Sequence, residues 1–286
     1  MCEDLTQGTL SAAFLNTPLA VSLVQKGVKV KIVTLGHRDG SGIMVRADSP
    51  ITSFAQLAGK KMLIPSRFSN QQLWLARLCK ENNMELASIN MVTAPPPDFP
   101  AMLESGACDA YVVGEPHCAR TEIAGTGRML LQVKDSWPNF ISCALVVRED
   151  AIDAQRELIQ ELVDGINGSG LWLEQGVDNR FSAADVVGKN YYNQDPKLLK
   201  YVLSKPIDRV RYDQLTPLQK DFDEIMTLGL EVGMFKEFMP FERYVDPSFA
   251  ARVPNVTVPM PPDDGHGIPG AVAPTPPATK AGIMTK

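Results

Sequence analysis

The chain has 286 residues, of which 44% are hydrophobic and 21% charged, and its formal net charge is −5. This is an ordinary globular balance, and the acidic pI of about 5.3 argues against the basic surface that nucleic-acid binding requires. No apolar run approaches the roughly 20 residues of a membrane-spanning helix. We therefore expect one large domain or two medium ones that bind no nucleic acid.

Short apolar runs alternate with helical patterns through the first 150 residues. Strands are expected at 28–33, 42–46, 62–65, 91–92, 129–133 and 142–148, and helical segments at 53–59, 71–82, 100–104 and 117–123. From residue 151 the pattern becomes helical, at 155–168, 171–176, 182–191, 196–203 and 218–236. Strands that alternate with helices, followed by a helical section, predict an α/β protein.

The sequence predicts different features at the two ends of the chain. Met1-Cys2-Glu3-Asp4 lacks the basic start and apolar core of a secretory signal. Taken literally, the chain is expected to stay in the cytoplasm; as part of a longer gene product, its signal would lie upstream. The segment 251–286 is rich in proline and glycine, so we expect a disordered or polyproline-like tail, either passive or used for docking.

The five cysteines show no C-x-x-C spacing and are odd in number; they are Cys2, Cys79, Cys108, Cys118 and Cys143. Neither a zinc site nor a disulfide framework is indicated, and small buried hydrophobic side chains are the expected role. The three histidines are too scattered for a metal cluster or a catalytic triad, and no Walker A or Gly-x-Ser-x-Gly motif is present. We expect no metal, no cofactor and no enzymatic activity.

One pattern occurs twice, at 5–18 and at 103–116. Each copy reads Leu-x-x-Gly, then Ala four residues after the Gly, a short apolar run and a Pro. Each therefore predicts a helix end with a glycine cap, a short buried strand and a turn that ends in proline. A chain with two such units is expected to have two similar lobes, with a small ligand in the cleft between them.

Several runs of this sequence resemble segments of one known protein family. The run Ile51-Thr52-Ser53-Phe54-Ala55-Gln56-Leu57-Ala58-Gly59-Lys60-Lys61 is similar to a typical segment of the periplasmic substrate-binding proteins of ABC importers, in the set that takes up nitrate, bicarbonate, sulfonates, taurine and thiamine precursors. Val113-Gly114-Glu115-Pro116 is similar to that family's second-lobe strand and turn. The runs 66–75 and 136–139 resemble its nitrate-like branch.

The resemblance, which covers about 5–245, implies an α/β fold of the type II periplasmic-binding-protein kind, with two lobes and a hinge. Lobe one is expected at 1–47 and 140–250 and lobe two at 48–139. The family's opening strand unit is absent, so lobe one is expected to lack its first part. Gln71 also stands where the nitrate-like branch usually has His, which replaces a possible cation with a neutral amide. The charged run that follows the Trp in that branch is not kept either, because Phe140 follows Asn139 here.

The candidate ligand-binding residues follow predicted strands, where the cleft of such a fold lies. They are Asn16, Thr17, Ser66, Ser69, Asn70, Gln71, Glu115, His117 and Trp137. Helix capping is an equal alternative for Asn16, Thr17 and the 66–71 loop. Glu115 could bind a cationic group or stabilise the hinge. Trp137 could form an aromatic wall against the ligand or pack within the hinge. Arg67 could clamp an oxyanion or simply be solvated.

The function implied is capture of a small anion or anionic organic solute, of the nitrate, sulfonate or taurine type, for delivery to an ABC permease and its ATPase. The membrane would be met only through the permease, and the full-length protein would be periplasmic or at the cell surface. Two alternatives remain: a thiamine-pyrimidine biosynthesis protein of the same fold, and a solute-sensing module. The first usually carries a cysteine-rich iron motif, whereas no two cysteines are adjacent here.

Overall fold

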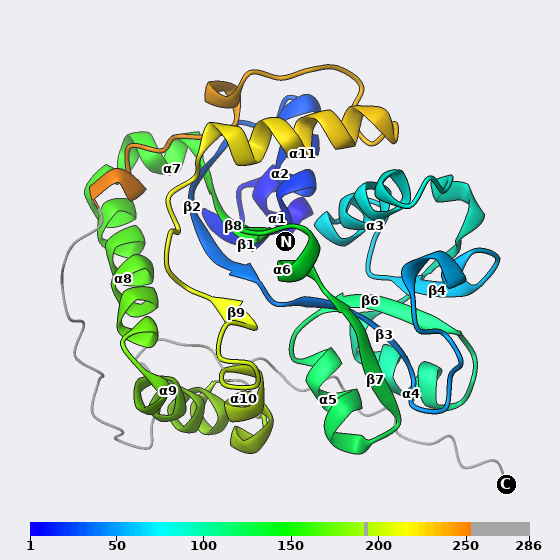
Figure 1. Cartoon of the computed structure of the whole chain (residues 1–286). Coiled ribbons are helices and arrows are strands. Elements are labelled where there is room, and N and C mark those ends of the chain that lie inside the picture. Colours follow the sequence, from blue (N-terminus) through cyan, green and yellow to red (C-terminus); the bar gives the residue numbers. More distant parts are fainter. Residues whose placement is uncertain (192–193, 253–286) are drawn as a thin grey trace, which may run out of the picture.

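The structure is a computed structural model that describes residues 1–191 and 194–252. Within these residues the chain forms two lobes, each built around its own sheet (Figure 1). The strand order is β1-β8-β2-β9 in lobe one and β5-β4-β6-β3-β7 in lobe two. The predicted α/β class and two-lobe arrangement are confirmed. The proline-rich tail, from 253 onward, lies outside the described residues.

Lobe one contains β1 (Ala12–Leu15), β2 (Val30–Asp39), β8 (Ile141–Arg148) and β9 (Val210–Arg211), with helices α1 (Cys2–Gln7), α2 (Thr17–Gln25), α7 (Glu149–Ala154), α8 (Arg156–Glu174), α9 (Val177–Asn190), α10 (Pro196–Val202) and α11 (Gln219–Glu231). Lobe two contains β3 (Ser41–Arg46), β4 (Lys61–Ile64), β5 (Asn90–Thr93), β6 (Ala110–Gly114) and β7 (Gly127–Gln132), with helices α3 (Asn70–Glu81), α4 (Phe99–Glu104), α5 (His117–Ala124) and α6 (Val133–Ser136). Short 3-10 turns lie at Phe54–Leu57, Leu86–Ser88, Pro96–Asp98, Phe241–Arg243 and Ala250–Arg252.

The two sequence repeats form matching structures. Helix α1 ends at Gly8 with φ 80°, and the turn after α4 passes through Gly106 with φ 74°. Strands β1 and β6 follow, and each runs antiparallel to a strand that comes from outside its own repeat, β8 and β3 respectively. Each strand leads through a proline into a helix, α2 or α5. The predicted helix end, glycine, strand and proline turn are therefore present in both lobes.

Within residues 1–191 and 194–252, the chain crosses between the lobes twice. Strand β2 ends at Asp39 in the lobe-one sheet and β3 begins at Ser41 in the lobe-two sheet, so the first crossing lies at Gly40. The return crossing runs from Trp137 to Phe140, just before β8. We expected lobe one to continue to residue 47; instead β3 pairs with β6 and β7 in lobe two. The sequence predicts a strand at 42–46 but contains no signal for its partners.

Helix α8 is longer than expected because its glycines do not end it. The sequence suggests two segments, 155–168 and 171–176, whereas α8 runs without a break through Gly170. A Cβ atom at Gly170 would lie 2.4 Å from the carbonyl oxygen of Tyr212. Gly170 is therefore required for close packing of α8 against the segment after β9.

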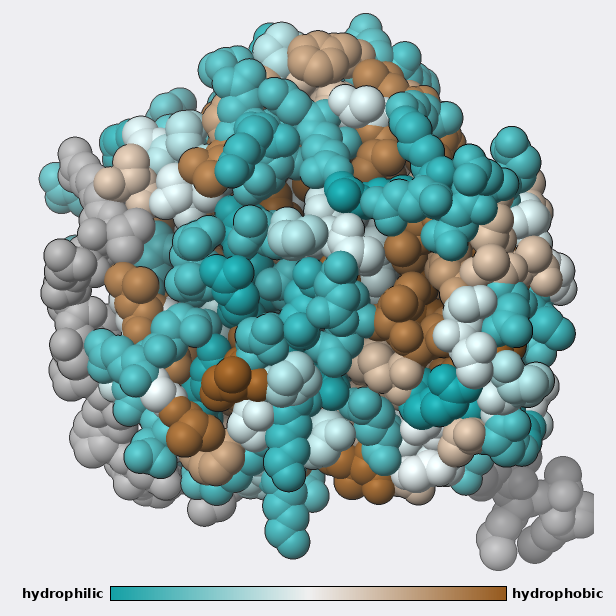
Figure 2. All heavy atoms as spheres, in the orientation of Figure 1, coloured by the Kyte–Doolittle hydropathy of each residue, from teal (hydrophilic) through white to brown (hydrophobic). Residues whose placement is uncertain are grey.

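The surface and interior are those of a folded globular body. Figure 2 shows a face that is mainly hydrophilic, with hydrophobic residues in separate groups. Within the described ranges, none of the helices combines the length and apolar character needed to cross a membrane. Of the cysteines, Cys79, Cys108 and Cys118 are buried, Cys2 and Cys143 are partly exposed, and all are free thiols.

Candidate functional site at the junction of the lobes

Five of the predicted site residues meet where helix α3 of lobe two reaches lobe one. They are Asn16, Thr17, Ser69, Asn70 and Gln71, and we call them the polar junction. Asn70, only 1% exposed, donates from Nδ2 to the carbonyl oxygens of Ile141 at 2.8 Å and Ser142 at 3.0 Å. Its backbone N–H donates to Asn16 Oδ1 at 3.4 Å. The polar junction thus connects the two lobes directly.

The start of α3 is fixed by its own sequence. Ser69 is the N-cap in extended conformation, and its hydroxyl accepts a hydrogen bond from the backbone N–H of Gln72 at 3.2 Å. The same hydroxyl donates to the carbonyl of Ser66 at 2.8 Å. Because α3 is twelve residues long, its N-terminus carries the partial positive charge that favours anions. Ser69 therefore caps the helix and also helps to form the junction.

Two acceptors of the polar junction lack hydrogen-bond partners. The side-chain carbonyl oxygens Asn70 Oδ1 and Gln71 Oε1 are buried and unpaired, while Gln71 Nε2 donates to Ser41 Oγ at 3.1 Å. A buried polar atom without a partner costs about 1–3 kcal/mol. These two acceptors would gain hydrogen bonds from an entering molecule that carries N–H or O–H donors.

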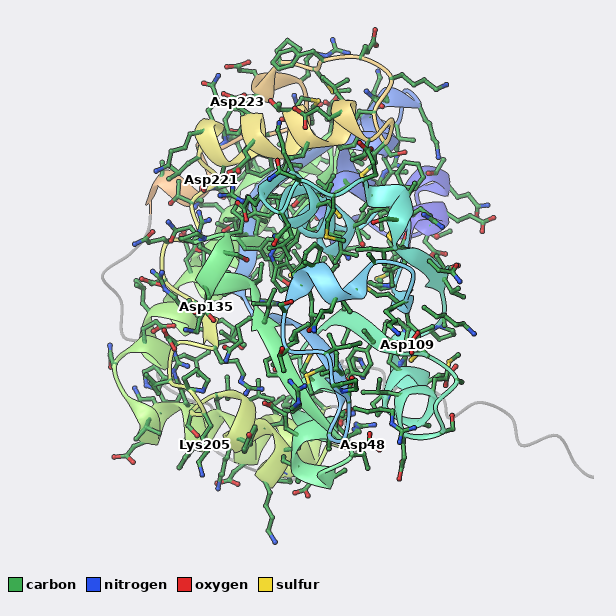
Figure 3. The ribbon with its side chains drawn as sticks, turned by 45° about the vertical axis from the view of Figure 1, so that its right-hand side comes forward. Asp48, Asp109, Asp135, Lys205, Asp221 and Asp223 are labelled. Carbon is green, nitrogen blue, oxygen red and sulfur yellow. The ribbon has the colours of Figure 1, made fainter. Side chains whose placement is uncertain are left out.

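Arg38 holds the two crossings together. This residue is fully buried, and it donates from Nε to the carbonyl of Gln214 at 2.8 Å and from Nη1 to the carbonyl of Asn139 at 2.6 Å. Its Nη2 forms an ion pair with Asp221 at 3.0 Å, without the alignment of a hydrogen bond. Asp221 lies on α11, as labelled in Figure 3. Arg38 comes from the first crossing and Asn139 from the second, so one side chain connects both crossings.

Asp39 lies beside Arg38 at the same crossing. Its side chain is almost fully buried, and this burial raises the pKa of the carboxyl group from 3.8 to about 6, against the opposing effect of Arg211 and Arg38. Its φ of 60° is in the left-handed region. A buried carboxyl group at a hinge makes the stability of this region dependent on pH.

Both carboxylate oxygens of Glu115 accept hydrogen bonds from other residues of the protein. Its Oε1 accepts a hydrogen bond from Arg209 Nη1 at 2.7 Å, and its Oε2 accepts from the backbone N–H of Ala119 at 3.0 Å. Arg209, 4% exposed, also pairs with Glu122 at 2.8 Å. Burial raises the pKa of Glu115, while Arg209 opposes that rise. These contacts join the helical section of lobe one to lobe two, which is the hinge role weighed for Glu115.

The side chains of Ser66 and Trp137 bond outside the polar junction, although the Ser66 carbonyl accepts from Ser69. Ser66 stays within its own loop, where its hydroxyl accepts from the backbone N–H of Phe68 at 3.0 Å. His117 begins α5, and burial lowers its pKa. Trp137 is 6% exposed and donates to Glu224 of α11 at 3.0 Å, so it packs at the return crossing. Arg67 is exposed and donates to the carbonyl of Met91 at 3.0 Å.

The sequence did not reveal three contributors: Arg38, Ser41 and Arg209. Each acts through partners that are far away along the chain. The glycines at 40 and 42 were the available signal for the crossing, because consecutive turn-forming residues between strands mark a change of direction. In the part of the chain that the structure describes, no group of three or more His, Cys, Asp or Glu side chains is placed to hold a metal ion.

Comparison with known proteins identifies a family whose model matches most of this chain. The family model of the NMT1-like family matches residues 1–188. The bicarbonate-binding protein CmpA of Synechococcus elongatus is 21% identical over 160 residues, which are 55% of this chain and 36% of that protein. The chain therefore matches only about a third of the length of this relative.

Solved structures with a similar fold include two binding proteins. The ligand-binding component of an ABC-type import system from Staphylococcus aureus gives a TM-score of 0.78 at 24% identity, with 89% of this chain and 84% of that chain covered. The periplasmic nitrate-binding protein NrtA of Synechocystis PCC 6803 gives 0.75 at 16% identity, with 91% and 80% covered.

The chain has the two-lobe, periplasmic-binding-protein-like fold of solute-binding proteins, as the resemblance implied. It belongs to the NMT1-like family.

Proposed function

We propose that the chain is the solute-binding component of an ABC importer and that it captures a small anion, or a small organic molecule with an anionic group, between its lobes. The observation that carries the proposal is the position of Asn70. This buried residue of lobe two holds the carbonyls of Ile141 and Ser142 in lobe one, at the N-terminus of a twelve-residue helix.

The direct contact between the lobes defines how a solute would enter. Few hydrogen bonds join the lobes at the polar junction, and each has a water molecule as an alternative partner once the lobes separate. Opening about the Arg38 hinge would expose the start of α3, and closure would surround a solute there. Binding would then be coupled to hinge motion.

The chemistry at the polar junction suits an anion bound by neutral donors. The N-terminus of α3 supplies partial positive charge, and opening of the lobes would free the Asn70 amide N–H groups that here bind Ile141 and Ser142. CmpA, NrtA and the Staphylococcus protein are each described as binding proteins, for bicarbonate, nitrate and an unspecified ligand. We infer a ligand of the nitrate, bicarbonate, sulfonate or taurine type. The partners would be an ABC permease and its ATPase, and the full-length protein would work in the periplasm or at the cell surface.

Thermal unfolding in the presence of candidate solutes tests this proposal. Nitrate, bicarbonate, taurine and ethanesulfonate would be added to the chain at constant ionic strength, with chloride as the control. A solute that binds only the folded state stabilises it by about 2.7 kcal/mol at a hundredfold excess over Kd. We expect at least one solute to raise the melting temperature above the chloride value. If none does so, the anion proposal is wrong.

A further inference from the structure

Two pairs of helices connect the lobes, one pair on each side of the crossing at Gly40. On one side α3 of lobe two contacts α11 of lobe one, and on the other side α5 of lobe two contacts α10 of lobe one (Figure 1). A rotation about the crossing that separates one pair of helices does not separate the other pair. The relative strength of the two contacts therefore decides on which side the lobes open.

The α3–α11 contact is part of the main hydrophobic core. One continuous cluster of buried side chains includes Trp74 of α3 and Phe222 of α11, together with residues of both sheets. Helix α11 is also bound to both crossings, because it forms an ion pair with Arg38 at the first and accepts a hydrogen bond from Trp137 at the second. Separation of α3 from α11 would expose apolar core surface at a cost of about 25 cal/mol per Å². We therefore expect this side to stay closed.

The α5–α10 contact is smaller and does not belong to that core. Its buried apolar residues form a separate cluster of four, which are Ala119, Leu198, Val202 and Val210. At its edge, Arg120 of α5 donates to the side chain of Gln194 at 3.1 Å. Opening on this side would expose little apolar surface.

One guanidinium group of lobe one holds this smaller contact together. Arg209 is 4% exposed, and its Nη1 donates to Glu115 Oε1 at 2.7 Å and to Glu122 Oε2 at 2.8 Å. Both carboxylates come from lobe two, so the bonds of Arg209 run between the lobes. Water would hydrate all three charged groups if the lobes moved apart, which offsets part of the energy of the lost ion pairs. The α5–α10 contact is therefore held by charge and is opened at a smaller apolar cost than the α3–α11 contact.

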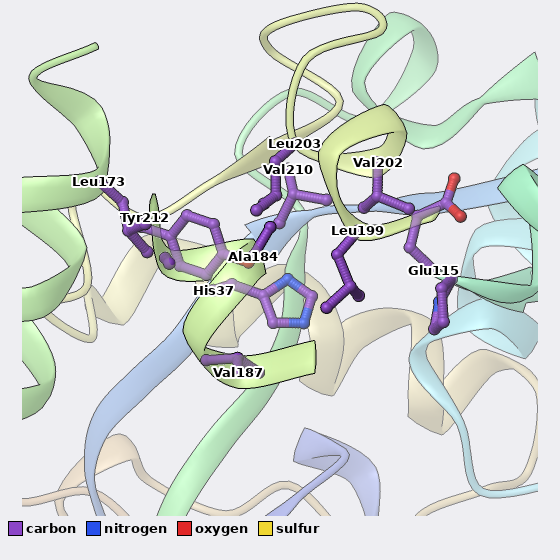
Figure 4. A pocket seen from close by; sticks show the side chains of 12 residues that line it. His37, Glu115, Leu173, Ala184, Val187, Leu199, Val202, Leu203, Val210 and Tyr212 are labelled. Atoms are coloured by element: carbon purple, nitrogen blue, oxygen red, sulfur yellow. The ribbon is translucent and has the colours of Figure 1, made fainter. Parts of the chain in front are cut away.

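A hollow between the lobes lies beside the α5–α10 contact. It has a volume of about 240 Å³, and Glu115 and Pro116 of lobe two line it together with residues of α8, α9, α10 and β9 (Figure 4). The polar junction is close to this hollow. A Cβ atom at Gly114, which precedes Glu115, would lie 3.9 Å from both Gln71 Nε2 and Ser41 Oγ. Widening of the hollow would thus bring solvent to the polar junction.

We propose that the lobes open on the α5–α10 side, with Arg209 as the latch that keeps them closed, while α3 and α11 remain in contact. Release of Arg209 from Glu122 would let α5 move away from α10 and widen the hollow. Opening on this side deepens the proposed function and rests on it, because capture of a solute requires the lobes to separate. The lobes can be followed without a solute, so failure of the latch and failure of solute binding are distinguishable.

Distance measurements between pairs of spin labels test the latch in the full chain. The labels are carried by encoded non-natural amino acids, so that the native cysteines stay unlabelled. One pair, at Glu104 and Asp178, follows the α5–α10 side, because α4 packs against α5 and α9 packs against α10. The second pair, at Ala87 and Thr227, follows the α3–α11 side, and all four residues are exposed. In the parent chain we expect a wider distribution of distances for the first pair than for the second.

Matched substitutions remove one arginine from each side. Arg209→Gln removes the latch, and we expect it to raise the ratio of long to short Glu104–Asp178 distances at least about tenfold, with the Ala87–Thr227 distances unchanged. Arg77→Gln removes the ion pair of α3 with Glu224 and should leave the Glu104–Asp178 distances as they are in the parent.

A second variant acts on the same contact without removing a charge. Ala119→Met places a longer side chain in the cluster between α5 and α10, and it should also lengthen the Glu104–Asp178 distances, which provides the test if Arg209→Gln does not fold. Three results would overturn the proposal: equal widths for the two label pairs in the parent, unchanged Glu104–Asp178 distances in the folded variants, or lengthening of the Ala87–Thr227 distances instead.

Discussion

The side-chain amide of Asn70 donates to the main-chain carbonyl of Ile141 at 2.8 Å, and this bond fastens helix α3 of one lobe to strand β8 of the other. A polar contact thereby joins the N-terminus of α3 in lobe two to the start of β8 in lobe one. The same helix is tied to α11 further along by the Arg77–Glu224 ion pair and by Lys80–Glu231 at 3.0 Å. The lobes are thus held by a buried polar contact at one end of α3 and by surface ion pairs along it.

Asn70→Ala should weaken this connection. The substitution leaves the carbonyls of Ile141 and Ser142 without their donor, so we expect a loss of about 1–3 kcal/mol in the free energy of unfolding. Asn82→Ala is the matched control, because Asn82 caps the end of the same helix and its side chain donates to the Leu78 carbonyl within that helix. Urea denaturation of both variants measures the difference. Equal losses in the two variants would mean that the interlobe hydrogen bonds stabilise the fold no more than a bond within one helix.

Arg209→Met should be strongly destabilising. The substitution leaves Glu115 and Glu122 as neighbouring carboxylates with no cation, and loss of one partner of a buried ion pair costs about 3–5 kcal/mol. In the control Arg211→Met, the lost pair with Asp213 is partly solvated, and we expect a change below about 1 kcal/mol. Chemical denaturation at neutral pH measures the free energy of unfolding of both variants. Similar losses in Arg209→Met and Arg211→Met would contradict the role of Arg209 in joining the two lobes.

Asp39→Asn should change the pH dependence of stability. The folded-state pKa is about 6 and lies above the ordinary value of 3.8, so the native state binds more protons between these two values. The free energy of unfolding is therefore expected to fall as the pH rises from about 4 to about 6 and to stay level above that range, as far as Asp39 contributes. Asparagine cannot ionise and tolerates the left-handed backbone at this position.

Asp39→Asn should consequently be the more stable protein above pH 6, by an amount on the order of 1–3 kcal/mol. Denaturation curves of parent and variant between pH 4 and pH 8 measure this difference. The exposed Asp48→Asn serves as the control, since Asp48 is 69% exposed and paired with Arg46 on the surface. If the free energy of unfolding changed with pH in the same way in the parent and in Asp39→Asn, the raised pKa of Asp39 would be refuted.

Gly8→Ala and Gly106→Ala should have the same effect, because the two glycines occupy the same place in the two repeats. Both have left-handed φ angles, 80° and 74°, where a side chain costs about 1–2 kcal/mol. Gly165→Ala in α8 has open space around its Cβ and no such φ, so we expect stabilisation of about 0.4–1 kcal/mol. Thermal denaturation provides the comparison, and a stabilising effect at Gly8 or Gly106 would rule out the shared cap.

The elements that sequence predicted well are those with local causes. The repeats at 5–18 and 103–116 contain their own glycine caps and prolines, and both formed as expected. The polar residues at 69–71 follow a buried strand, which is why their place at the junction of the lobes could be anticipated. The α8 helix was divided wrongly, because Gly170 serves close packing against Tyr212, a contact between positions more than forty residues apart.

The site features that sequence missed all depend on distant partners. Arg38 meets Asn139, and Arg209 meets Glu115, from segments about a hundred residues apart. His37 likewise lies beside Tyr212, with 6.1 Å between the ring centroids, and no local pattern connects the two residues. Periodicity and turn signals describe a segment and its buried face, but they carry no information on which segments will meet.

Isothermal titration of the parent chain and two α3 variants tests the central claim most directly. The solute that most raises the melting temperature would be titrated into the parent, Asn70→Ala and Asn82→Ala proteins. If the solute binds at the polar junction, the parent and Asn82→Ala give the same saturable heat and Asn70→Ala binds at least tenfold more weakly. Equal binding by Asn70→Ala, with the variant shown to be folded, would contradict capture of the solute at this junction.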